Sequence, residues 1–413
     1  MIDKQKIMIL GAGRDQTGII KKARKMGYYT IVVSKSGSYP GFAIADKSYE
    51  IDVVQKERVL EVAELEKICG VVTDQLDAAV LTVAYVAEKM GLPGIGYDCA
   101  IKFANKYTMR QICTKIGIPV PKHFKAATLD DAVRCAKELD FPLMIKPVDS
   151  GGSRGVSKVN DFSELEYKFE NACGLSRSGK VIMEEFFPGA EFAVVGFVID
   201  YEYTNLGVGE RFYFDVPDTF IPRRTLYPAL LNQEIKDTIT KIDSRLITHL
   251  GPKFGNTYSE YLINLETGDV RIVEIAIRGC GALTSSDLVP LACGIDVNEL
   301  LILIASGNGD VRIDHSKRIN KASGNIFFHL PEAVISEIRG LEEVSKVPGV
   351  YQTYLQNIQV GKETKQMVDK GDRLGPILIM GEDRTELQDV INRVTNTLYI
   401  HVETAKGIKG IIW

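Results

Sequence analysis

Two acidic residues near position 270 lie on segments that the sequence predicts to be neighbouring strands. Glu260 ends one segment, and Glu274 interrupts the apolar, β-branched run at residues 270–277. An unpaired carboxylate in that run would be costly, so we expect a cation or a hydrogen-bond donor to meet Glu274. Arg278 comes four residues later, and even spacing along an extended strand directs its side chain to the same face.

These two carboxylates and the guanidinium have the composition of a site for an anion that is bridged by Mg2+. Mg2+ prefers oxygen ligands and is commonly held by one or two carboxylates together with phosphate oxygens. The alternative is a salt-bridged pair inside the protein core. Glu260, Glu274 and Arg278 do not decide between the two by themselves.

A glycine-rich loop at residues 149–157 follows an apolar strand, residues 143–147, that carries Lys146. Glycines let the backbone approach an anion and direct several N–H groups at it, and Lys146 adds a positive charge. The loop differs from the P-loop pattern, because no Lys-Ser or Lys-Thr pair ends it. A plain β-hairpin turn is the alternative, but a partly buried lysine needs a counter-anion.

The segment from Met183 to Glu191 joins this unit to the next one and has the sequence Met-Glu-Glu-Phe-Phe-Pro-Gly-Ala-Glu. Backbone groups of such a crossing segment can bind a purine edge while Phe186 and Phe187 pack on its face. Glu191 could hold ribose hydroxyls. A plain interdomain hinge is the alternative, and the segment alone does not exclude it.

The segments that position these residues follow a regular order. Residues 6–96 alternate apolar strands, near 7–10, 30–33 and 70–73, with amphipathic helices, which indicates a parallel sheet covered by helices. A helical stretch at 98–117 precedes a β-α-β-β-α-β module, whose first helix opens with an acidic capping box at Thr128 and Asp131. Antiparallel strands are predicted from about 191 to 307, with helices at about 232–250 and after Asp296. The last hundred residues mix strands and helices and end in a helix at 385–399.

The first predicted strand ends in a glycine-containing turn, Gly11-Ala12-Gly13, which resembles a dinucleotide-binding motif. Gln16 stands where the third glycine of that motif should be, and the second strand ends in Ser34 without the acid that would hold a ribose. The sequence therefore argues against NAD. The turn could still bind a small molecule at a helix N-terminus.

Length and composition favour a soluble globular protein of two or three domains. The chain has 413 residues, 45% hydrophobic and 25% charged, with a net charge of -4, which argues against nucleic acid or an anionic membrane as the main partner. No signal peptide or membrane-spanning run is predicted, and seven scattered cysteines without a CxxC pair indicate reduced thiols. We expect a cytoplasmic protein.

In their order, these elements resemble the ATP-grasp superfamily of carboxylate-amine ligases, including bacterial amino-acid ligases and carbamoyl-phosphate synthase large-subunit-like proteins. The resemblance covers about Tyr97 to Gly307. It implies that ATP and Mg2+ (or Mn2+) bind, that Glu260 and Glu274 hold the metal, and that Arg278 and Lys146 act in catalysis. It implies that the following residues bind the nucleotide: Lys106, Lys146, Ser150, Gly151, Gly152, Ser153, Gly155, Val156, Glu184, Glu185, Phe186, Phe187 and Glu191.

The same resemblance implies an α/β and α+β architecture, an ATP-grasp fold behind a parallel α/β domain. The expected parts are an N-terminal domain (1–96), a helical linker (97–120), a lid (121–187), a catalytic subdomain (188–307) and a C-terminal α/β extension (308–413). The chain departs from the family at Ala276, where many members have a metal-binding Asn. Members that resemble bacterial dipeptide ligases tolerate a small residue there, and the following Arg278-Gly279-Cys280-Gly281 is compatible with that group.

The implied reaction activates a small carboxylate, such as an amino acid, as an acyl phosphate and joins it to an amine, with ADP and phosphate as products. The alternatives are a bicarbonate-activating carboxylase or carbamoyl-phosphate-synthase-type enzyme, and a nucleotide-binding protein without turnover. Partners would be small-molecule carboxylate and amine substrates, with a homodimer possible and no nucleic acid or membrane. We also hypothesise that Arg223 or Arg224, in the proline-rich loop at 216–228, binds the carboxylate or the phosphates.

Overall fold

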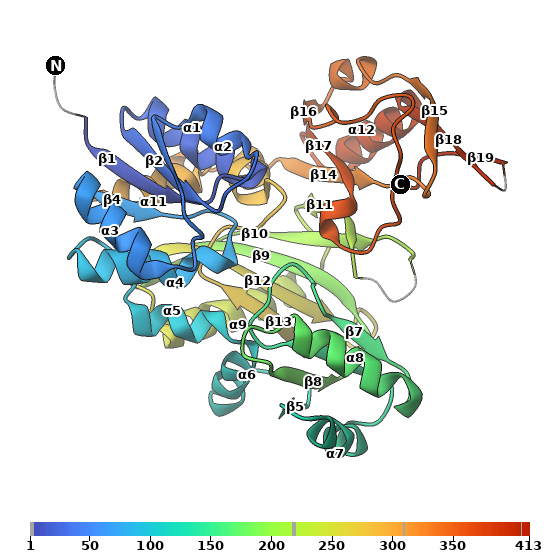
Figure 1. The fold of residues 1–413 in the computed structure, drawn as a ribbon, viewed down its shortest axis with the longest axis horizontal. Coiled ribbons are helices and arrows are strands. Elements are labelled where there is room, and N and C mark those ends of the chain that lie inside the picture. Colours follow the sequence, from blue (N-terminus) through green and yellow to red (C-terminus); the bar gives the residue numbers. More distant parts are fainter. Residues whose placement is uncertain (1–3, 217–219, 309, 406) are drawn as a thin grey trace.

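The computed structural model describes residues 4–216, 220–308, 310–405 and 407–413 (Figure 1). Its N-terminal unit is a parallel sheet of order β3-β2-β1-β4, as the alternating pattern predicts. The strands are β1 (Lys6–Leu10), β2 (Tyr29–Ser34), β3 (Lys47–Glu50) and β4 (Gly70–Val72), and the helices are α1 (Thr17–Lys25), α2 (Pro40–Ile44), α3 (Lys56–Glu66) and α4 (Asp77–Lys89). The edge strand β3 was not predicted, because its side chains are mostly exposed and it carries no apolar run.

The predicted helical stretch at 98–117 is two helices, α5 (Tyr97–Ala104) and α6 (Lys106–Lys115). Asn105 breaks the helix with extended backbone angles, and its side chain accepts a hydrogen bond from the N–H of Thr108, which caps α6. The break places Lys106 at the first position of α6. Lys106 and Arg110 therefore lie one turn apart on the same helix face.

The expected lid module is a four-stranded antiparallel sheet of order β5-β8-β6-β7 with two helices on it. The capping box of Thr128 and Asp131 is present at the start of its first helix. Figure 1 shows this module at the foot of the molecule. Its elements are β5 (His123–Ala126), α7 (Leu129–Leu139), β6 (Leu143–Pro147), β7 (Ser157–Val159), α8 (Phe162–Gly174) and β8 (Val181–Glu185).

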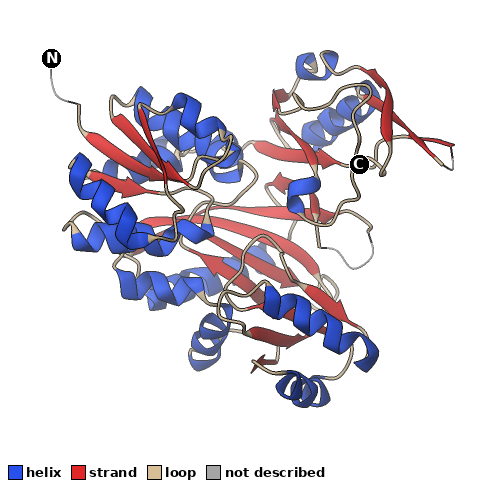
Figure 2. Ribbon diagram, viewed as in Figure 1, coloured by secondary structure: helices blue, strands red, loops and turns tan. Residues whose placement is uncertain are grey.

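The central sheet has eight strands in the order β13-β12-β9-β10-β11-β14-β17-β16 and runs through the middle of the molecule (Figure 2). All of its pairings are antiparallel. Its strands are β9 (Ala190–Ile199), β10 (Glu202–Tyr213), β11 (Pro222–Tyr227), β12 (Gly255–Ile263), β13 (Val270–Ala276), β14 (Ala322–Phe328), β16 (Val350–Thr353) and β17 (Leu374–Gly381). The expected division at residue 307 therefore does not separate two sheets, because β11 pairs with β14 across it.

Helices cover this sheet and tie it to the N-terminal unit. They are α9 (Gln233–Leu250), η2 (Thr284–Leu288), α10 (Val289–Cys293) and α11 (Val297–Ala305). Ile302 and Ala305 of α11 belong to the apolar core under β1 and β2, so a helix of the catalytic part closes one face of the parallel sheet. The remaining C-terminal elements are β15 (Val334–Arg339), η5 (Lys370–Asp372), α12 (Arg384–Thr397), β18 (Tyr399–Thr404) and β19 (Gly407–Lys409).

Among the described residues, no single helix combines the length and the apolar composition needed to cross a membrane. One pair, Thr284–Cys293 with Val297–Ala305, meets both criteria together but is bent by 117° between its two parts.

Candidate active site

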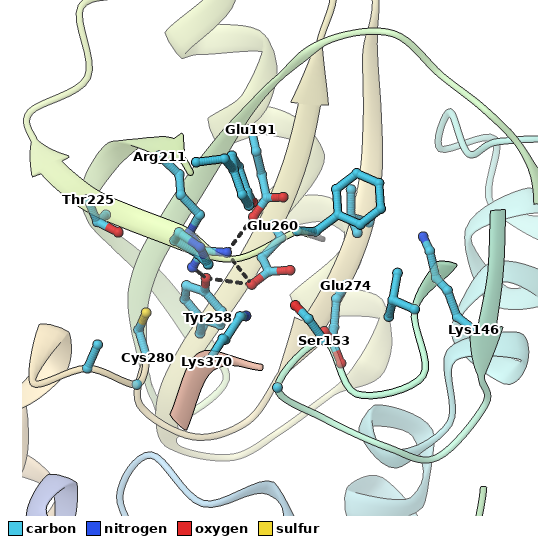
Figure 3. Close-up of a pocket in the computed structure, with 18 of the residues that line it drawn as sticks. Lys146, Ser153, Glu191, Arg211, Thr225, Tyr258, Glu260, Glu274, Cys280 and Lys370 are labelled. Carbon is cyan, nitrogen blue, oxygen red and sulfur yellow. Dashed lines mark hydrogen bonds and ion pairs between the residues drawn. The ribbon is translucent and has the colours of Figure 1, made fainter. Parts of the chain in front are cut away.

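A cavity of about 710 Å3 opens where the lid, the central sheet, the N-terminal unit and the C-terminal residues meet (Figure 3). Its volume lies within the usual range for small-molecule sites. The residues that the family resemblance assigns to nucleotide, metal or catalysis all line it except Gly151 and Gly155, which lie in the same loop. Segments more than 170 residues apart in the chain thus contribute to one site.

Glu260 and Glu274 are cross-strand partners in the register of β12 and β13, and both face the cavity. The cation that meets Glu274 is Lys106, whose Nζ lies 2.6 Å from Oε1 of Glu274 and also donates to the carbonyl of Ser150 at 2.7 Å. The Glu274 side chain keeps 23% of its surface exposed. Glu274 is therefore salt-bridged, but the pair lies in the wall of a cavity and not inside the core, and its role at a metal stays a prediction.

Arg278 does not pair with Glu274, because β13 ends at Ala276 and the chain bends before Arg278. The strand does not stay extended as far as Arg278, which was the condition for the two side chains to share a face, but both line the cavity. The guanidinium of Arg278 instead forms a two-bond ion pair with Asp77 at the start of α4, with distances of 2.7 and 2.9 Å. Burial alone would lower the pKa of Arg278, but Asp77 raises it.

Glu260 belongs to a hydrogen-bonded network with residues of β9, β10 and its own strand (Figure 3). Arg211 Nη1 donates to Glu260 Oε1 at 2.8 Å and also to Glu191, and the Tyr258 hydroxyl donates to Glu260 at 2.7 Å. Burial would raise the pKa of Glu260, but Arg211 and then Lys370 bring it well below its usual range. Glu260 is thus an ionised carboxylate at neutral pH, ready to hold a cation.

Glu184 lies at the buried end of the cavity with both carboxylate oxygens occupied. Arg110 Nε donates to Oε1 at 2.5 Å, and Lys146 Nζ donates to Oε2 at 2.6 Å. Burial would raise the pKa of Glu184, but Arg110 and Lys146 lower it to about 2. Glu184 supplies the counter-anion that a buried Lys146 requires, and its expected role in nucleotide binding stays a prediction.

Two phenylalanines of the crossing segment line the cavity, and a cation covers each ring. Lys158 Nζ lies 4.3 Å from the ring centre of Phe186, and the guanidinium carbon of Arg271 lies 4.9 Å from that of Phe187. Such cation–π contacts fix the rings at the cavity edge. Their packing against a base stays a prediction, as does the role of Glu191 at a ribose.

The glycine turn after β1 does not leave an open anion site at its helix N-terminus. The side chain of Gln16 fills this turn, where its Oε1 accepts from the N–H of Gly13 and its Nε2 donates to the carbonyl of Asp74. Its neighbours Arg14 and Asp15 reach the other domains: Arg14 donates to the carbonyl of Gly375, and Asp15 accepts from the N–H of Ala282. The turn connects domains, consistent with the argument against NAD.

The geometry gives no support to the hypothesis about Arg223 and Arg224, because neither is among the described residues that line the cavity. Arg223 donates to the carbonyl of Trp413, and Arg224 lies over the ring of Phe212 at 5.2 Å. Residues 217–219 of the same loop lie outside the described residues. Arg211, on the neighbouring strand β10, is one of the arginines that do line the cavity.

Several cavity residues were not predicted from the sequence. Lys370 and Arg373 come from the C-terminal part, and Asp77 comes from the N-terminal part. Burial, with Arg211 and Arg14 nearby, lowers the pKa of Arg373 to about 9. The sequence offered one signal for Arg211, a charged residue in a long strand. It offered none for Lys370, which begins the short helix η5 about 90 residues after Arg278. The unpredicted cavity residues with charged side chains are Arg14, Asp15, Asp77, Arg110, Arg211, Lys370 and Arg373.

The donor set fits Mg2+ that is shared with a phosphate ligand. Within the described ranges, no three His, Cys, Asp or Glu side chains form a group that could hold a metal ion. Mg2+ commonly takes one or two carboxylates and completes its shell with substrate phosphates and water. Glu260 and Glu274 supply two carboxylates, and Ala276, buried beside them opposite Tyr258, supplies no ligand atom.

Two family models match the chain. The model described as "D-ala D-ala ligase C-terminus" matches residues 112–301, and that described as "L-amino acid ligase C-terminal domain 2" matches residues 326–403. The crystal structure of L-amino acid ligase from Bacillus licheniformis is similar to this structure, with a TM-score of 0.81 at 21% identity, covering 98% of this chain and 100% of that one.

Sequence relatives cover different shares of the chain. The uncharacterized protein y4rH of Sinorhizobium fredii is 24% identical over 406 residues, 96% of this chain and 82% of that protein. Formate-dependent phosphoribosylglycinamide formyltransferase of Wolinella succinogenes is 28% identical over 256 residues, 60% of this chain and 63% of that enzyme. The carbamoyl phosphate synthase large chain of Vibrio vulnificus is 26% identical over 303 residues, 68% of this chain but 28% of that chain.

The comparisons confirm the resemblance expected from the order of the motifs. The family models span the lid, the catalytic strands and the C-terminal part, and the neighbouring structure shares the fold over the whole chain. The chain therefore has an ATP-grasp fold and matches ligase family models over residues 112–301 and 326–403.

Proposed function

We propose that this protein uses ATP and Mg2+ (or Mn2+) to activate a small carboxylate and join it to an amine, releasing ADP and phosphate. The observation that carries the proposal is the cross-strand pair Glu260 and Glu274, opposite each other in one cavity with Lys106, Lys146, Arg278 and the glycine loop. Phosphoryl transfer asks a protein mainly for positioning and for neutralisation of charge. This set of residues supplies both.

In the first step, a carboxylate oxygen of the substrate attacks the γ-phosphorus of ATP, the bond to the β-phosphate oxygen breaks, and ADP leaves. Lys106 and Lys146 would contact the phosphates, Arg278 would stabilise the transferring group, and Glu260 with Glu274 would hold the metal. The metal, when bound, would neutralise phosphate charge. The carboxylate becomes an acyl phosphate.

In the second step, the amine nitrogen attacks the acyl carbon, the bond to the phosphate oxygen breaks, and the nitrogen loses a proton. Water would destroy the acyl phosphate, so the reaction requires a closed site. The lid loop carries Ser150, Gly152 and Ser153 into the cavity wall, and Lys106 donates to the carbonyl of Ser150. This contact supports closure of the loop over bound nucleotide.

An amino acid is the carboxylate that we favour. The support is the match of residues 326–403 to the L-amino acid ligase domain, because this part of the chain also supplies Lys370 and Arg373 to the cavity. The roles of the nucleotide-binding residues, a homodimer and a cytoplasmic location remain proposals.

An ADP-release screen with Mg2+ tests the proposal. Amino acids and other small carboxylates are offered singly and in pairs, with bicarbonate as a separate arm. We expect ADP release to require a carboxylate, and the amide product to require an amine as well. Bicarbonate-dependent release alone would favour a carboxylase, and ATP binding without release would favour a protein that has lost turnover.

Glu274→Gln is the variant that tests the metal site in the same assay. We expect ADP release to fall by about a thousandfold, because the amide cannot replace a carboxylate ligand and Lys106 loses its partner. Glu266→Gln, an exposed glutamate in the turn between β12 and β13, is the matched control and should keep full activity. Activity that survives Glu274→Gln would mean that the metal has another holder.

A further inference from the structure

The orientation of Arg278 is set by a residue of the N-terminal unit. Arg278 Nε donates to Asp77 Oδ1 at 2.7 Å, and Nη2 donates to Asp77 Oδ2 at 2.9 Å. A third bond runs from Nη1 to the carbonyl of Gly279 at 3.0 Å, and the guanidinium carbon lies 5.3 Å from the ring centre of Tyr258. The guanidinium plane is therefore fixed along one edge and against one face.

This arrangement decides which part of Arg278 can meet a ligand. A guanidinium has five N–H donors in a rigid fork, and Asp77 and Gly279 use three of them. The remaining donors belong to Nη1 and Nη2, the end of the fork farthest from the main chain. An Arg278 without Asp77 could rotate about its side-chain bonds and would lose this alignment, because no other described side chain accepts from it.

The lid loop lies directly on the same aspartate. A Cβ added to Gly151 would lie 2.5 Å from Asp77 Oδ2, which is too close without a shift of one of the two. The neighbouring Ser150 accepts through its carbonyl from Lys106. The loop that would cover the phosphates therefore contacts Lys106 directly. It is also linked to Arg278, because Asp77 contacts both Gly151 and Arg278.

We propose that Asp77 is a positioning residue with two contacts. It holds Arg278 in the orientation needed for the reaction, and Gly151 of the lid loop packs against it. Through Asp77, the N-terminal unit couples closure of the lid loop to the orientation of Arg278. The part of this proposal that concerns rate rests on the proposed function. The part that concerns the lid rests only on nucleotide binding.

Asp77→Asn tests the rate. This change keeps the size of the side chain but leaves one oxygen to accept from both Nε and Nη2 of Arg278. We expect kcat to fall by about tenfold to a hundredfold, with less than about a threefold change in the KM for ATP. Glu57→Gln, which removes the exposed first-turn acid of α3 in the same unit, is the matched control and should change neither. If kcat falls no more in Asp77→Asn than in Glu57→Gln, the proposal is overturned.

A double variant separates positioning from general damage. Lysine at position 278 has no fork for Asp77 to hold, so Asp77→Asn should cost less than about threefold in an Arg278→Lys background. An equal cost in both backgrounds would mean that Asp77 does not act through Arg278. Thermal unfolding of each variant excludes loss of the fold as the cause.

Limited proteolysis tests the lid without any ligase substrate. Arg154 is exposed in the lid loop and offers a trypsin site. We expect MgADP to slow cleavage after Arg154 in the wild-type protein and in Glu57→Gln, and to slow it much less in Asp77→Asn and Gly151→Ala. Full MgADP protection in both site variants would overturn the proposal. If MgADP protects the variants in the expected pattern but the ADP-release screen finds no activity, the proposed function is rejected. The role of Asp77 in holding the lid loop is then kept.

Discussion

Most buried charged residues in this site have partners that the sequence does not identify. At Asp74, the effect of burial on the pKa is larger than the effect of its hydrogen-bond partners. Asp74 lies just after β4 and accepts a hydrogen bond from Gln75 at 2.8 Å. Burial raises its pKa to about 7, and the bonds from Gln75 and Asn298 lower it only in part. Folding therefore favours the protonated carboxyl. In the unfolded chain the Asp74 carboxyl ionises near pH 4, so the contribution of Asp74 to the free energy of unfolding should fall as pH rises from about 4 to 7.

Asp74→Asn should remove this dependence, because an amide does not ionise. We expect the variant to gain about 2 to 4 kcal/mol relative to the wild type between pH 4 and pH 8, and urea unfolding at the two pH values measures the difference. The conservative control is Asp98→Asn, an exposed acid in the first turn of α5. An equal effect of Asp74→Asn at both pH values would contradict the account.

Single helices and strands carry the site as units, and α6 is the clearest example. It presents Lys106 to Glu274 of the central sheet and, one turn later, Arg110 to Glu184 of the lid. The helix thus joins the two sheets that enclose the cavity. Arg110 and Glu184 are each 1% exposed, so their charges have little contact with water.

Glu184→Gln should therefore be strongly destabilising, because Arg110 and Lys146 would remain buried without an anion. We expect a loss of about 3 to 5 kcal/mol in urea unfolding at pH 7. Arg134→Ala removes an exposed partner of Asp131 in the lid and should cost about 1 kcal/mol or less. A similar cost for both variants would show that the buried pair contributes no more than a surface pair.

The elements that the sequence predicts are those with local signals. The Thr128 and Asp131 capping box, the apolar β6 and the strand pair that carries Glu260 and Glu274 all have periodicity or capping residues that act within a few positions. The break at Asn105 and the edge strand β3 lack such signals. The pairing of β11 with β14, about 100 residues apart, depends on the tertiary fold, so no local pattern indicates that the central sheet continues beyond residue 307.

The complete molecule is needed to form the cavity, because four parts of the chain contribute to its wall. Lys370 illustrates this dependence: it comes from the C-terminal part and lies beside Glu260 in Figure 3. Burial lowers the pKa of Lys370, as does Arg211, whereas Glu260 and Glu191 raise it. The order of the motifs predicted that Glu260, Glu274, Lys106 and Lys146 share one site, but residues such as Lys370 and Asp77 reach the cavity only through domain packing.

Lys370→Met should lower kcat/KM for the carboxylate substrate by about tenfold or more, because it removes a positive charge that interacts with Glu260 in the cavity. Lys365→Met, an exposed lysine five residues earlier, is the control and should have no effect. Steady-state kinetics with varied carboxylate concentration measures both. Equal kinetics for the two variants would remove Lys370 from the reaction and leave it a structural residue.

Transfer of oxygen from substrate to phosphate tests the central claim most directly. The carboxylate substrate identified by the ADP-release screen is labelled with 18O in its carboxyl group and incubated with the protein, ATP, Mg2+ and the amine. An acyl phosphate requires that one carboxyl oxygen leave with the phosphoryl group, so mass spectrometry should find one 18O atom in each phosphate released. Phosphate without 18O, formed at the same rate as the amide product, would contradict activation through an acyl phosphate.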